Sequence, residues 1–193
     1  MQFYQELTLL TGAEISIYHL WSKVYQQLHI GLAELLEDGR GEIGVSFPEY
    51  QESGEDRGLG MKLRVFSKSE EILERLDLKK QLRRFDDYVH ITGVRPIPVS
   101  AVRGHAVYCR CHSENSQRQK ARRYAKRHDI EYEEALELFP KDNWKGLAPY
   151  IQLQSLSTGR PFRLHIVKQE ASEICDNGFG AYGLDNASTV PEF

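Results

Sequence analysis

A dense run of cations lies between residues 116 and 128, and binding of phosphate groups is the chemistry that such a run can do. At about 100° per residue on a helical wheel, these cations spread over one broad arc, whereas Ala121, Tyr124 and Ala125 share the narrow arc that is left. The cations are Arg118, Lys120, Arg122, Arg123, Lys126 and Arg127. Because like charges at this spacing repel one another, the pattern predicts a helix over 116–128 whose wide cationic face meets an anionic partner.

Charge is segregated along the chain. Between Arg95 and His128 the sequence has nine Lys or Arg and one acid, Glu114, for a local net charge of +8, whereas the whole chain carries −3 and the remainder therefore −11. A local basic field on an otherwise acidic protein favours a phosphate backbone as partner. A membrane surface would require bulky apolar residues opposite the cations, where this segment has Ala and one Tyr. We expect a nucleic acid, and a merely solvated charged face is the alternative.

The sequence shows no group of acids spaced to hold Mg²⁺, which is one route to phosphodiester cleavage. The side chains of Asp86 and Asp87 are adjacent in sequence and would diverge. Cys109, Cys111 and His112 lie close together, but the chain offers no second ligand pair, so we do not expect a zinc site either. No metal and no other cofactor is expected.

Length and composition are those of an ordinary globular protein, with 193 residues, 40% of them apolar and 27% charged. Glu6 stands where a signal peptide would need an apolar run, and no window approaches the length of a membrane span. Three cysteines without a spaced framework fit a reducing compartment. We therefore expect a cytoplasmic protein that does not contact a membrane.

The first half of the chain alternates strand and helix patterns. Strands are predicted over 2–10, 42–47, 62–67 and 88–94, and helices over 15–36 and from Ser69 through Leu76, extending to Leu82. The order is β-α-β-β-α-β, which is the ferredoxin-like topology. The sequence predicts an α+β protein whose residues 1–98 form this ferredoxin-like domain.

The second half is predicted to be a smaller α/β domain, residues 99–193, that presents the basic helix. Residues 95–100 include two prolines and form a stiff, extended bridge into it. Strands are predicted over 106–111, 150–155 and 162–167, a short helix over 131–138, and a glycine-rich closing strand over 178–183. We expect this domain to need the first half for its own core.

Five segments of the sequence resemble one known family. They are QQLHIGLA in the first predicted helix, IGVSFP in the second strand, ARRYAKRHD in the basic helix, QSLSTGRPFRL, and GFGAYGL near the end. Together they extend from near residue 20 almost to the last residue, in the family's order and at about its spacing. The chain resembles the type I-F CRISPR-associated endoribonuclease, which cuts the repeat hairpins of a precursor transcript into guide RNAs.

The resemblance implies roles for particular residues. His29 corresponds to the family's catalytic histidine, Ser155 to a serine that positions the attacking ribose, and Tyr182 to a tyrosine lining the same site. Arg110 corresponds to an arginine that reads the base pair before the cut, and Phe162 to an aromatic residue that stacks beneath that pair. His112 stands where a known member has a glutamine, at a position that bears on reading of the second-last base pair. It is included among the candidate RNA contacts. Arg122, Arg123, Lys126 and Arg127 correspond to the helix that enters the major groove of the hairpin, and Arg118 in the same segment is a further candidate RNA contact.

The residue types are compatible with RNA cleavage without a metal, because the 2′-hydroxyl of RNA can attack the adjacent phosphate once a base removes its proton. The unperturbed pKa of histidine, about 6.5, suits that task at neutral pH. His29 lies beside an apolar stripe, so a buried, hydrogen-bonded structural histidine is the alternative from position alone. Ser155 and Ser157 alternate at a strand edge, where their hydroxyls could hold the 2′-hydroxyl or a phosphate oxygen.

The expected function is a metal-independent endoribonuclease that binds CRISPR repeat hairpins in crRNA processing for antiviral defence, leaves a 2′,3′-cyclic phosphate, and remains on its product. The resemblance implies that it then joins other subunits of a type I-F guide-RNA surveillance complex. The alternative is a subunit that binds hairpin RNA and has lost catalysis.

Overall fold

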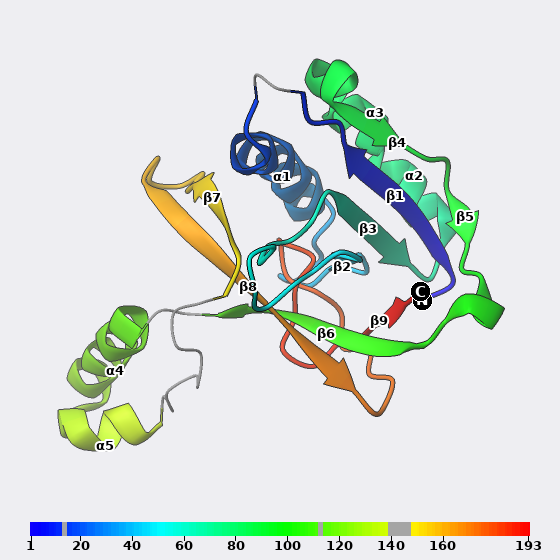
Figure 1. Ribbon diagram of the computed structural model, residues 1–193. Helices are drawn as coiled ribbons and strands as arrows, with labels where there is room; N and C mark the ends of the chain where they lie inside the picture. Colours follow the sequence, from blue (N-terminus) through cyan, green and yellow to red (C-terminus); the bar gives the residue numbers. More distant parts are fainter. Residues whose placement is uncertain (13–14, 112–113, 139–147) are drawn as a thin grey trace. The chain divides into compact units, whose positions relative to one another are not determined.

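The computed structural model describes residues 1–12, 15–111, 114–138 and 148–193, drawn as a ribbon in Figure 1. The chain forms two compact units. The first comprises Met1–Arg110 together with Pro149–Phe193, and the second comprises Cys111–Ala148. These units do not follow the predicted division between residues 98 and 99. Among the described residues, no helix is both long and apolar enough to cross a lipid bilayer.

The first sheet of the larger unit contains β1 (Phe3–Leu9), β2 (Gly44–Ser46), β3 (Lys62–Ser67) and β4 (Val89–Ile91). Its strand order is β2-β3-β1-β4, with antiparallel pairs throughout, and the short β5 (Arg95–Pro96) also pairs with β1. With α1 (Ile17–Glu34) and α2 (Glu70–Leu76), the elements follow the predicted order β-α-β-β-α-β. The segment expected to be a bridge at 95–100 is therefore attached to this sheet at its beginning, and η2 (Val99–Ala101) follows it.

One face of α1 is buried, as the apolar spacing of its sequence predicts. The buried residues of α1 are Leu20, Trp21, Val24, Tyr25, Leu28, His29, Gly31 and Leu32. They recur three or four positions apart, which places them on one side of the helix. His29 is thus held on the core side of α1, with only 8% of its surface exposed.

The second predicted helix is shorter than expected, because the backbone changes direction at Asp77. This residue has a φ of 44°, in the left-handed region, so α2 ends there and α3 (Leu78–Gln81) begins. The Asp77 carboxylate accepts a hydrogen bond from the Lys80 backbone N–H and caps the new helix. The 3-10 helix η1 (Arg83–Tyr88) then leads into β4.

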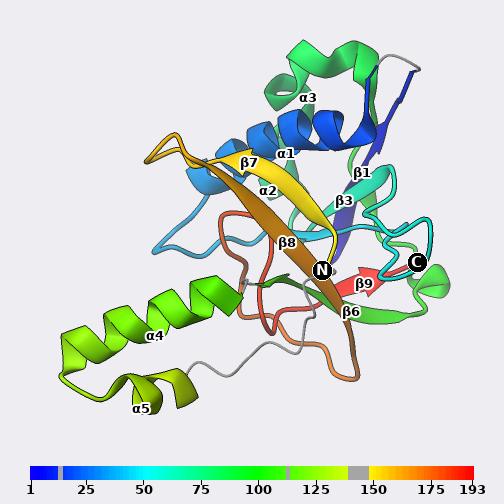
Figure 2. The same ribbon diagram turned by 60° about the vertical axis from the view of Figure 1, so that its left-hand side comes forward.

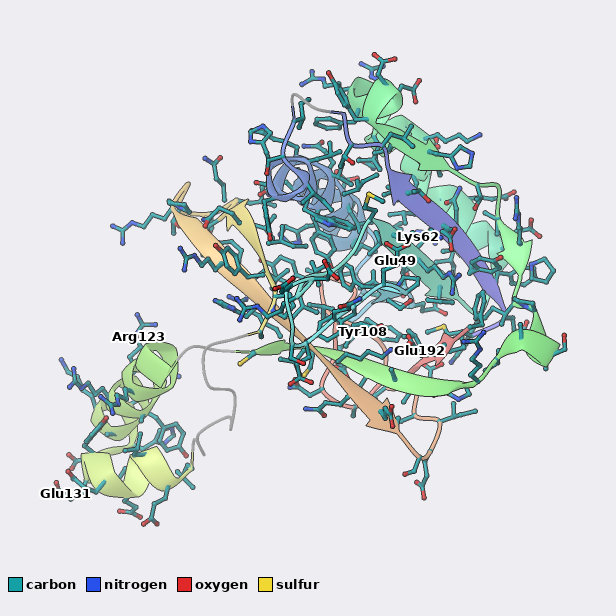
Figure 3. All side chains as sticks on the ribbon, viewed as in Figure 1. Glu49, Lys62, Tyr108, Arg123, Glu131 and Glu192 are labelled. Carbon is teal, nitrogen blue, oxygen red and sulfur yellow. The ribbon has the colours of Figure 1, made fainter. Side chains whose placement is uncertain are left out.

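A second sheet contains β6 (Gly104–Cys111), β7 (Tyr150–Gln154), β8 (Pro161–Ala171) and β9 (Val190–Glu192), in the order β7-β8-β6-β9. Most of its buried side chains belong to the same hydrophobic cluster as those of the first sheet. Tyr108, labelled in Figure 3, illustrates this, because its hydroxyl lies 3.1 Å from the Phe47 carbonyl oxygen and 3.0 Å from Glu192 Oε1. This shared core is the physical reason why the larger unit does not end at residue 98.

The glycine-rich segment at 178–183 was expected to be a strand, and this prediction is wrong. The segment is a series of turns, and the last strand is β9. Gly178 and Gly183 have φ angles of 76° and 67°, which side chains with a Cβ rarely adopt. A Cβ on Gly183 would also lie 2.5 Å from Val45 Cγ1. The glycines therefore allow a loop to pass close over the first sheet, and this loop carries Tyr182.

The smaller unit contains α4 (Glu114–His128) and α5 (Tyr132–Glu137). Its core is made of three alanines, Ala121, Ala125 and Ala135, with Tyr124, Ile130, Tyr132 and Leu136 packed around them. The stripe expected to dock the basic helix is therefore confirmed. Asp129 has a φ of 54°, and the Ile130 N–H donates to the Ala125 carbonyl, which ends α4.

Candidate active site and basic helix

The environment of His29 determines which of its ring nitrogens carries a proton. Nδ1 lies 2.8 Å from the carbonyl oxygen of Ala181, in the glycine-rich loop. A carbonyl oxygen can only accept a hydrogen bond, so Nδ1 must be the donor. In a neutral imidazole, Nε2 then has the lone pair and can accept a proton. His29 is buried and hydrogen-bonded, and the same hydrogen bond leaves Nε2 as a base.

Tyr182 fixes the plane of the His29 ring. The two rings are stacked with centroids 4.1 Å apart and an interplanar angle of 16°. Burial raises the pKa of Tyr182 above its ordinary value, and the nearby Arg110 guanidinium opposes that shift. The Tyr182 hydroxyl is therefore neutral around pH 7 and can donate a hydrogen bond.

Arg110 of β6 lies beside two aromatic rings. Its guanidinium carbon is 5.3 Å from the centre of the Phe162 ring and 5.7 Å from that of Tyr182, within the range of cation–π attraction. The Phe162 and Tyr182 rings meet edge to face at 6.4 Å. Arg110 Nε is buried and has no hydrogen-bond partner among the described residues. The structure thus brings together four of the predicted site residues, His29, Tyr182, Arg110 and Phe162.

Ser155 and Ser157 lie in the turn between β7 and β8, where their Oγ atoms are 3.2 Å apart. The Thr158 backbone N–H donates to Ser155 Oγ, and Gly159 completes the turn with a φ of 66°. The Ser155 hydroxyl therefore makes these contacts within its own turn. It joins His29 only indirectly: Gln26, one helical turn before His29, accepts a hydrogen bond of 2.9 Å from the backbone N–H of Gln154.

Tyr25 and Gln26 were not recognised from the sequence as part of the site. The Tyr25 hydroxyl donates to the Tyr182 carbonyl at 2.8 Å, so Tyr25 and His29 hold consecutive carbonyls of the same loop. The available signal for Tyr25 was its position four residues before His29, because this spacing places both side chains on one face of the helix. Full burial raises the pKa of Tyr25 far above its ordinary value, which keeps this donor protonated.

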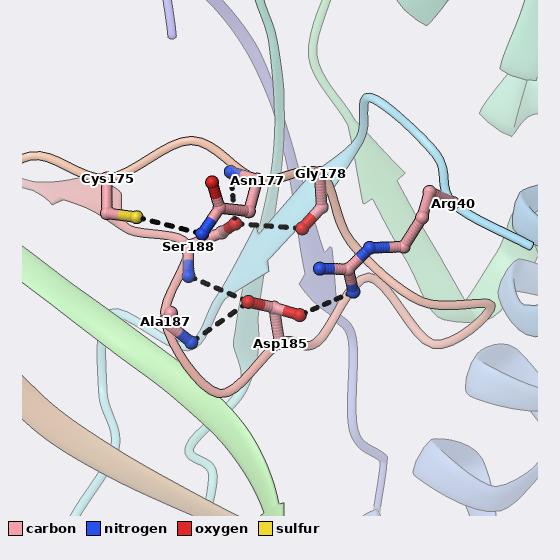
Figure 4. Close-up of polar contacts among 7 residues, drawn as sticks. All are labelled: Arg40, Cys175, Asn177, Gly178, Asp185, Ala187 and Ser188. Atoms are coloured by element: carbon pink, nitrogen blue, oxygen red, sulfur yellow. Dashed lines mark hydrogen bonds and ion pairs between the residues drawn. The ribbon is translucent and has the colours of Figure 1, made fainter.

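A polar network holds the loop that carries Tyr182, as Figure 4 shows. Asp185 accepts hydrogen bonds from the backbone N–H groups of Ala187 and Ser188 and forms an ion pair of 2.6 Å with Arg40. Burial by itself would raise the pKa of Asp185, but these hydrogen bonds and the Arg40 charge together hold it below its ordinary value. Ser188 Oγ in turn donates to the Gly178 carbonyl. The loop geometry therefore depends on an ionised Asp185.

The basic helix α4 presents its cations on the surface of the smaller unit, and Arg123 is labelled in Figure 3. The predicted RNA-binding residues that are exposed on α4 are Arg118, Arg122, Arg123, Lys126 and Arg127. The guanidinium of Arg122 lies 5.6 Å from the ring centre of Tyr132 on α5, and the His128 ring stacks on Tyr124 at 4.1 Å. Contacts with aromatic rings order the Arg122 and His128 side chains, and the contact of Arg122 does not neutralise its charge. His112 lies outside the described residues.

No group of three or more His, Cys, Asp or Glu side chains that could hold a metal ion occurs among the described residues. The groups that the larger unit brings together are a base at Nε2 of His29, a neutral phenol, and a guanidinium beside two aromatic rings. The two serine hydroxyls lie in the turn between β7 and β8. Such groups can move a proton, hold an anion and stack a nucleobase.

Comparisons with known proteins extend over the whole chain. Residues 4–193 match the family model described as CRISPR-associated protein (Cas_Csy4). The chain is 30% identical over 197 residues to the CRISPR-associated endonuclease Cas6/Csy4 of Pseudomonas aeruginosa (strain UCBPP-PA14). It is 28% identical over 195 residues to the protein of the same name from Escherichia coli (strain UTI89 / UPEC). Both alignments cover 100% of each chain.

Similar solved structures are more distant. One, titled "An RAMP protein binding different RNA substrates", has 13% identity and a TM-score of 0.39, with 100% of both chains covered. Another, titled "Characterization of a Cas6-related gene from Pyrococcus furiosus", has the same identity and TM-score and covers 99% of this chain and 98% of that one.

Proposed function

This chain belongs to the Cas_Csy4 family of CRISPR-associated proteins, and from that membership we propose that it is the endoribonuclease that cleaves a CRISPR precursor transcript into guide RNAs. It binds the stem-loop of the repeat and cuts at the base of the stem without a metal ion. Residues 1–98 supply the catalytic histidine, and residues 99–193 supply the RNA-binding helix. The observation that carries the proposal is the hydrogen bond that leaves Nε2 of His29 as a base beside Tyr182 and Arg110.

In the proposed mechanism, Nε2 of His29 removes the proton from the 2′-hydroxyl of the nucleotide before the cut. The 2′-oxygen then forms a bond to the adjacent phosphorus, the bond from phosphorus to the 5′-oxygen breaks, and that oxygen takes up a proton. The products are a 2′,3′-cyclic phosphate and a 5′-hydroxyl. Acid–base catalysis of this kind typically contributes 10²–10⁴-fold to the rate.

The other residues of the larger unit position the RNA. Ser155 orients the 2′-hydroxyl and Ser157 holds a phosphate oxygen. Tyr182 fixes the orientation of the His29 imidazole by stacking on it. Two contacts support this: the paired Ser155 and Ser157 hydroxyls, and the close stack of His29 on Tyr182. Orientation of this kind lowers the barrier because the reacting atoms must be in line.

Base recognition is assigned to Arg110 and Phe162. Phe162 stacks beneath the last base pair of the stem, and Arg110 hydrogen-bonds the edge of a base in that pair. The unpartnered Nε of Arg110 and the two rings beside its guanidinium support this assignment. A bidentate contact from arginine to guanine is worth about 1–3 kcal/mol of discrimination in DNA complexes.

The exposed cations of α4 bind the phosphates of the stem from within its major groove. An A-form major groove is deep and narrow, so recognition there depends on charge and shape more than on base edges. His112, next to this helix in sequence, is proposed as a further RNA contact. The protein stays on its product, works in the cytoplasm and joins other subunits of a type I-F guide-RNA complex.

Cleavage of the cognate repeat RNA in the presence of EDTA, followed by analysis of both new ends, tests the proposal. We expect wild type to cut and to leave a 2′,3′-cyclic phosphate and a 5′-hydroxyl. A requirement for added Mg²⁺, or a 5′-phosphate product, would mean that water is the nucleophile and that His29 is wrongly assigned. Tight hairpin binding with no cleavage under any condition would instead identify a catalytically inactive RNA-binding subunit.

A further inference from the structure

The two strands β7 and β8 form a ribbon that joins at the Ser155–Ser157 turn, and Figure 2 shows them side by side in yellow and orange. Side chains alternate between its faces. Ile151, Leu153, Leu164 and Ile166 are buried in the core. The opposite face, here called the outer face, consists of Tyr150, Gln152, Gln154, Pro161, Arg163 and His165. All of these are exposed except His165, which is half-buried.

The outer face combines aromatic rings with cations. The Arg163 guanidinium lies 4.6 Å from the ring centre of Tyr150, and the Tyr150 and His165 rings are 5.2 Å apart. Tyr150 and His165 are also direct cross-strand partners, so both are held by the ladder. Arg160 adds an exposed cation in the turn, and the sequence from 150 to 167 contains no Asp or Glu. An exposed aromatic ring among cations without acids is typical of surfaces that bind single-stranded nucleic acid.

The position of the outer face relates it to the proposed cleavage site. Phe162 and Arg163 are consecutive residues of β8, so their side chains point to opposite faces of the ribbon. Phe162 faces Tyr182 on the site side, and Arg163 faces away from it. The turn carrying Ser155 and Ser157 connects the two faces. An RNA chain whose phosphate is held at that turn can therefore continue around the turn onto the outer face.

We propose that the outer face binds the unpaired RNA on the 3′ side of the scissile phosphate, an inference that rests on the proposed function. Tyr150 stacks on a base of this RNA, Arg163 and Arg160 contact phosphates of its backbone, and Gln152 and Gln154 add hydrogen bonds to it. Backbone charge and stacking do not depend strongly on base identity, so this contact increases affinity without reading sequence. The occupant is RNA because the ribbon offers cations and rings with no acid, which complements an anionic strand.

The test compares two repeat hairpins that carry 2′-deoxy at the nucleotide before the cut, so that neither can be cleaved. One ends just after the scissile phosphate, and the other continues with several unpaired nucleotides. For wild type, the extension should tighten binding about tenfold, within the range of one or two stacked bases. Tyr150→Ala and Arg163→Ala should each lose most of this gain and bind the short hairpin like wild type.

Two controls separate the contributions. Arg84→Ala removes an exposed arginine from η1 instead and should retain the full gain. An extension of abasic nucleotides keeps the phosphates but offers no base to Tyr150, so it should give wild type a smaller gain than the normal extension, and Tyr150→Ala should bind the two extended hairpins alike. Melting temperatures of the free variants show whether the cation–π pair only stabilises the ribbon.

The inference is overturned if the extension adds nothing to wild-type affinity, or if its gain persists in both variants. In the first case the outer face faces solvent or a protein. Cleavage of an unmodified hairpin is measured in parallel. Wild type that cuts this RNA but gains nothing from the extension refutes only the outer-face inference, whereas wild type that shows the gain but never cuts refutes the proposed function.

Discussion

The two compact units of this protein are stabilised in different ways. The larger unit buries large side chains such as Tyr25, Phe47 and Phe66 in one cluster to which both sheets contribute. The core of the smaller unit consists of three alanines and the residues packed around them, and its surface carries exposed cations. Dense packing of large side chains fixes positions closely, whereas a small core only needs to keep a helix folded.

This difference matches what each unit is proposed to do. In-line attack requires reacting atoms to be held within a fraction of an ångström, which favours a rigid core. Attraction between cations and phosphates acts over several ångströms and tolerates movement. Changes in the larger unit should therefore affect cleavage, and changes in the smaller unit should affect hairpin binding.

The largest expected effect is the loss of cleavage in His29→Ala. Removing the base should slow the chemical step by a factor of order 10² or more, while the affinity for a non-cleavable hairpin changes little. Single-turnover cleavage and equilibrium binding measure the two quantities. His19→Ala is the matched control, because it removes an exposed histidine from the same helix. If His29→Ala lost hairpin affinity and cleavage to the same extent, the assignment of cleavage to the larger unit and of hairpin binding to the smaller unit would be wrong.

Ser155→Ala sharpens the same point. It should slow cleavage strongly with affinity nearly unchanged, and its effect should combine with that of His29→Ala less than additively, because residues serving one transition state act as a unit. Wild type should also fail to cut RNA with 2′-deoxy before the cut, while binding it normally. A normal cleavage rate on that RNA would contradict the roles of both residues.

The next effect concerns Phe162, which lies in the larger unit but is proposed to bind RNA. Phe162→Leu keeps apolar bulk and removes most stacking, so hairpin affinity should fall by about 1–3 kcal/mol. The melting temperature should change little, because Phe162 is only partly buried. Leu156→Ala is the control, because it removes an exposed apolar side chain from the turn between β7 and β8. A large drop in melting temperature would show instead that Phe162 mainly stabilises the core.

A smaller effect on the stability of the larger unit is expected for Asp185→Asn. Three hydrogen bonds to a carboxylate would be weakened, so unfolding at pH 7 should cost about 1–2 kcal/mol less, and cleavage should fall through displacement of Tyr182. Since the folded-state pKa of Asp185 lies below its unfolded value, its contribution is complete above about pH 4 and is lost as the pH falls through the folded-state pKa.

Unfolding curves from pH 3 to pH 7 check this prediction. The difference between wild type and Asp185→Asn should be largest at pH 7 and shrink at the acidic end. Asp176→Asn is the control, because Asp176 pairs with a more exposed cation, Lys68, and exposed pairs contribute little. A difference that is independent of pH would mean that Asp185 acts through packing and not through its charge.

The smallest single effects are expected in the smaller unit. Arg123→Ala and Arg127→Ala should each weaken hairpin binding a few-fold and lower the slope of log affinity against log salt by about 1. At saturating protein, the cleavage rate should equal that of wild type. Unchanged slopes in both variants would mean that α4 faces solvent or a protein partner, and the contrast between the units would lose its functional meaning.

Local patterns in the sequence were sufficient to predict most elements. Strand β3 and the buried face of α1 follow directly from apolar spacing, because period two and period 3.6 are properties of the chain itself. The same holds for the alanine stripe of α4, which is buried as its spacing predicts. The glycine-rich segment was mistaken for a strand, because glycine permits positive φ angles that no periodicity reveals.

The sequence by itself determined the charge of α4 and the set of residue types that the site uses. Only the tertiary structure decided how these residues meet. The proton on Nδ1 of His29 depends on a carbonyl 152 positions away in the chain, and that carbonyl is placed by a loop anchored through Tyr25 and Asp185. A contact between residues so far apart requires the complete core. This is also why the larger unit does not end at residue 98, since β6 to β9 bury their side chains against the first sheet.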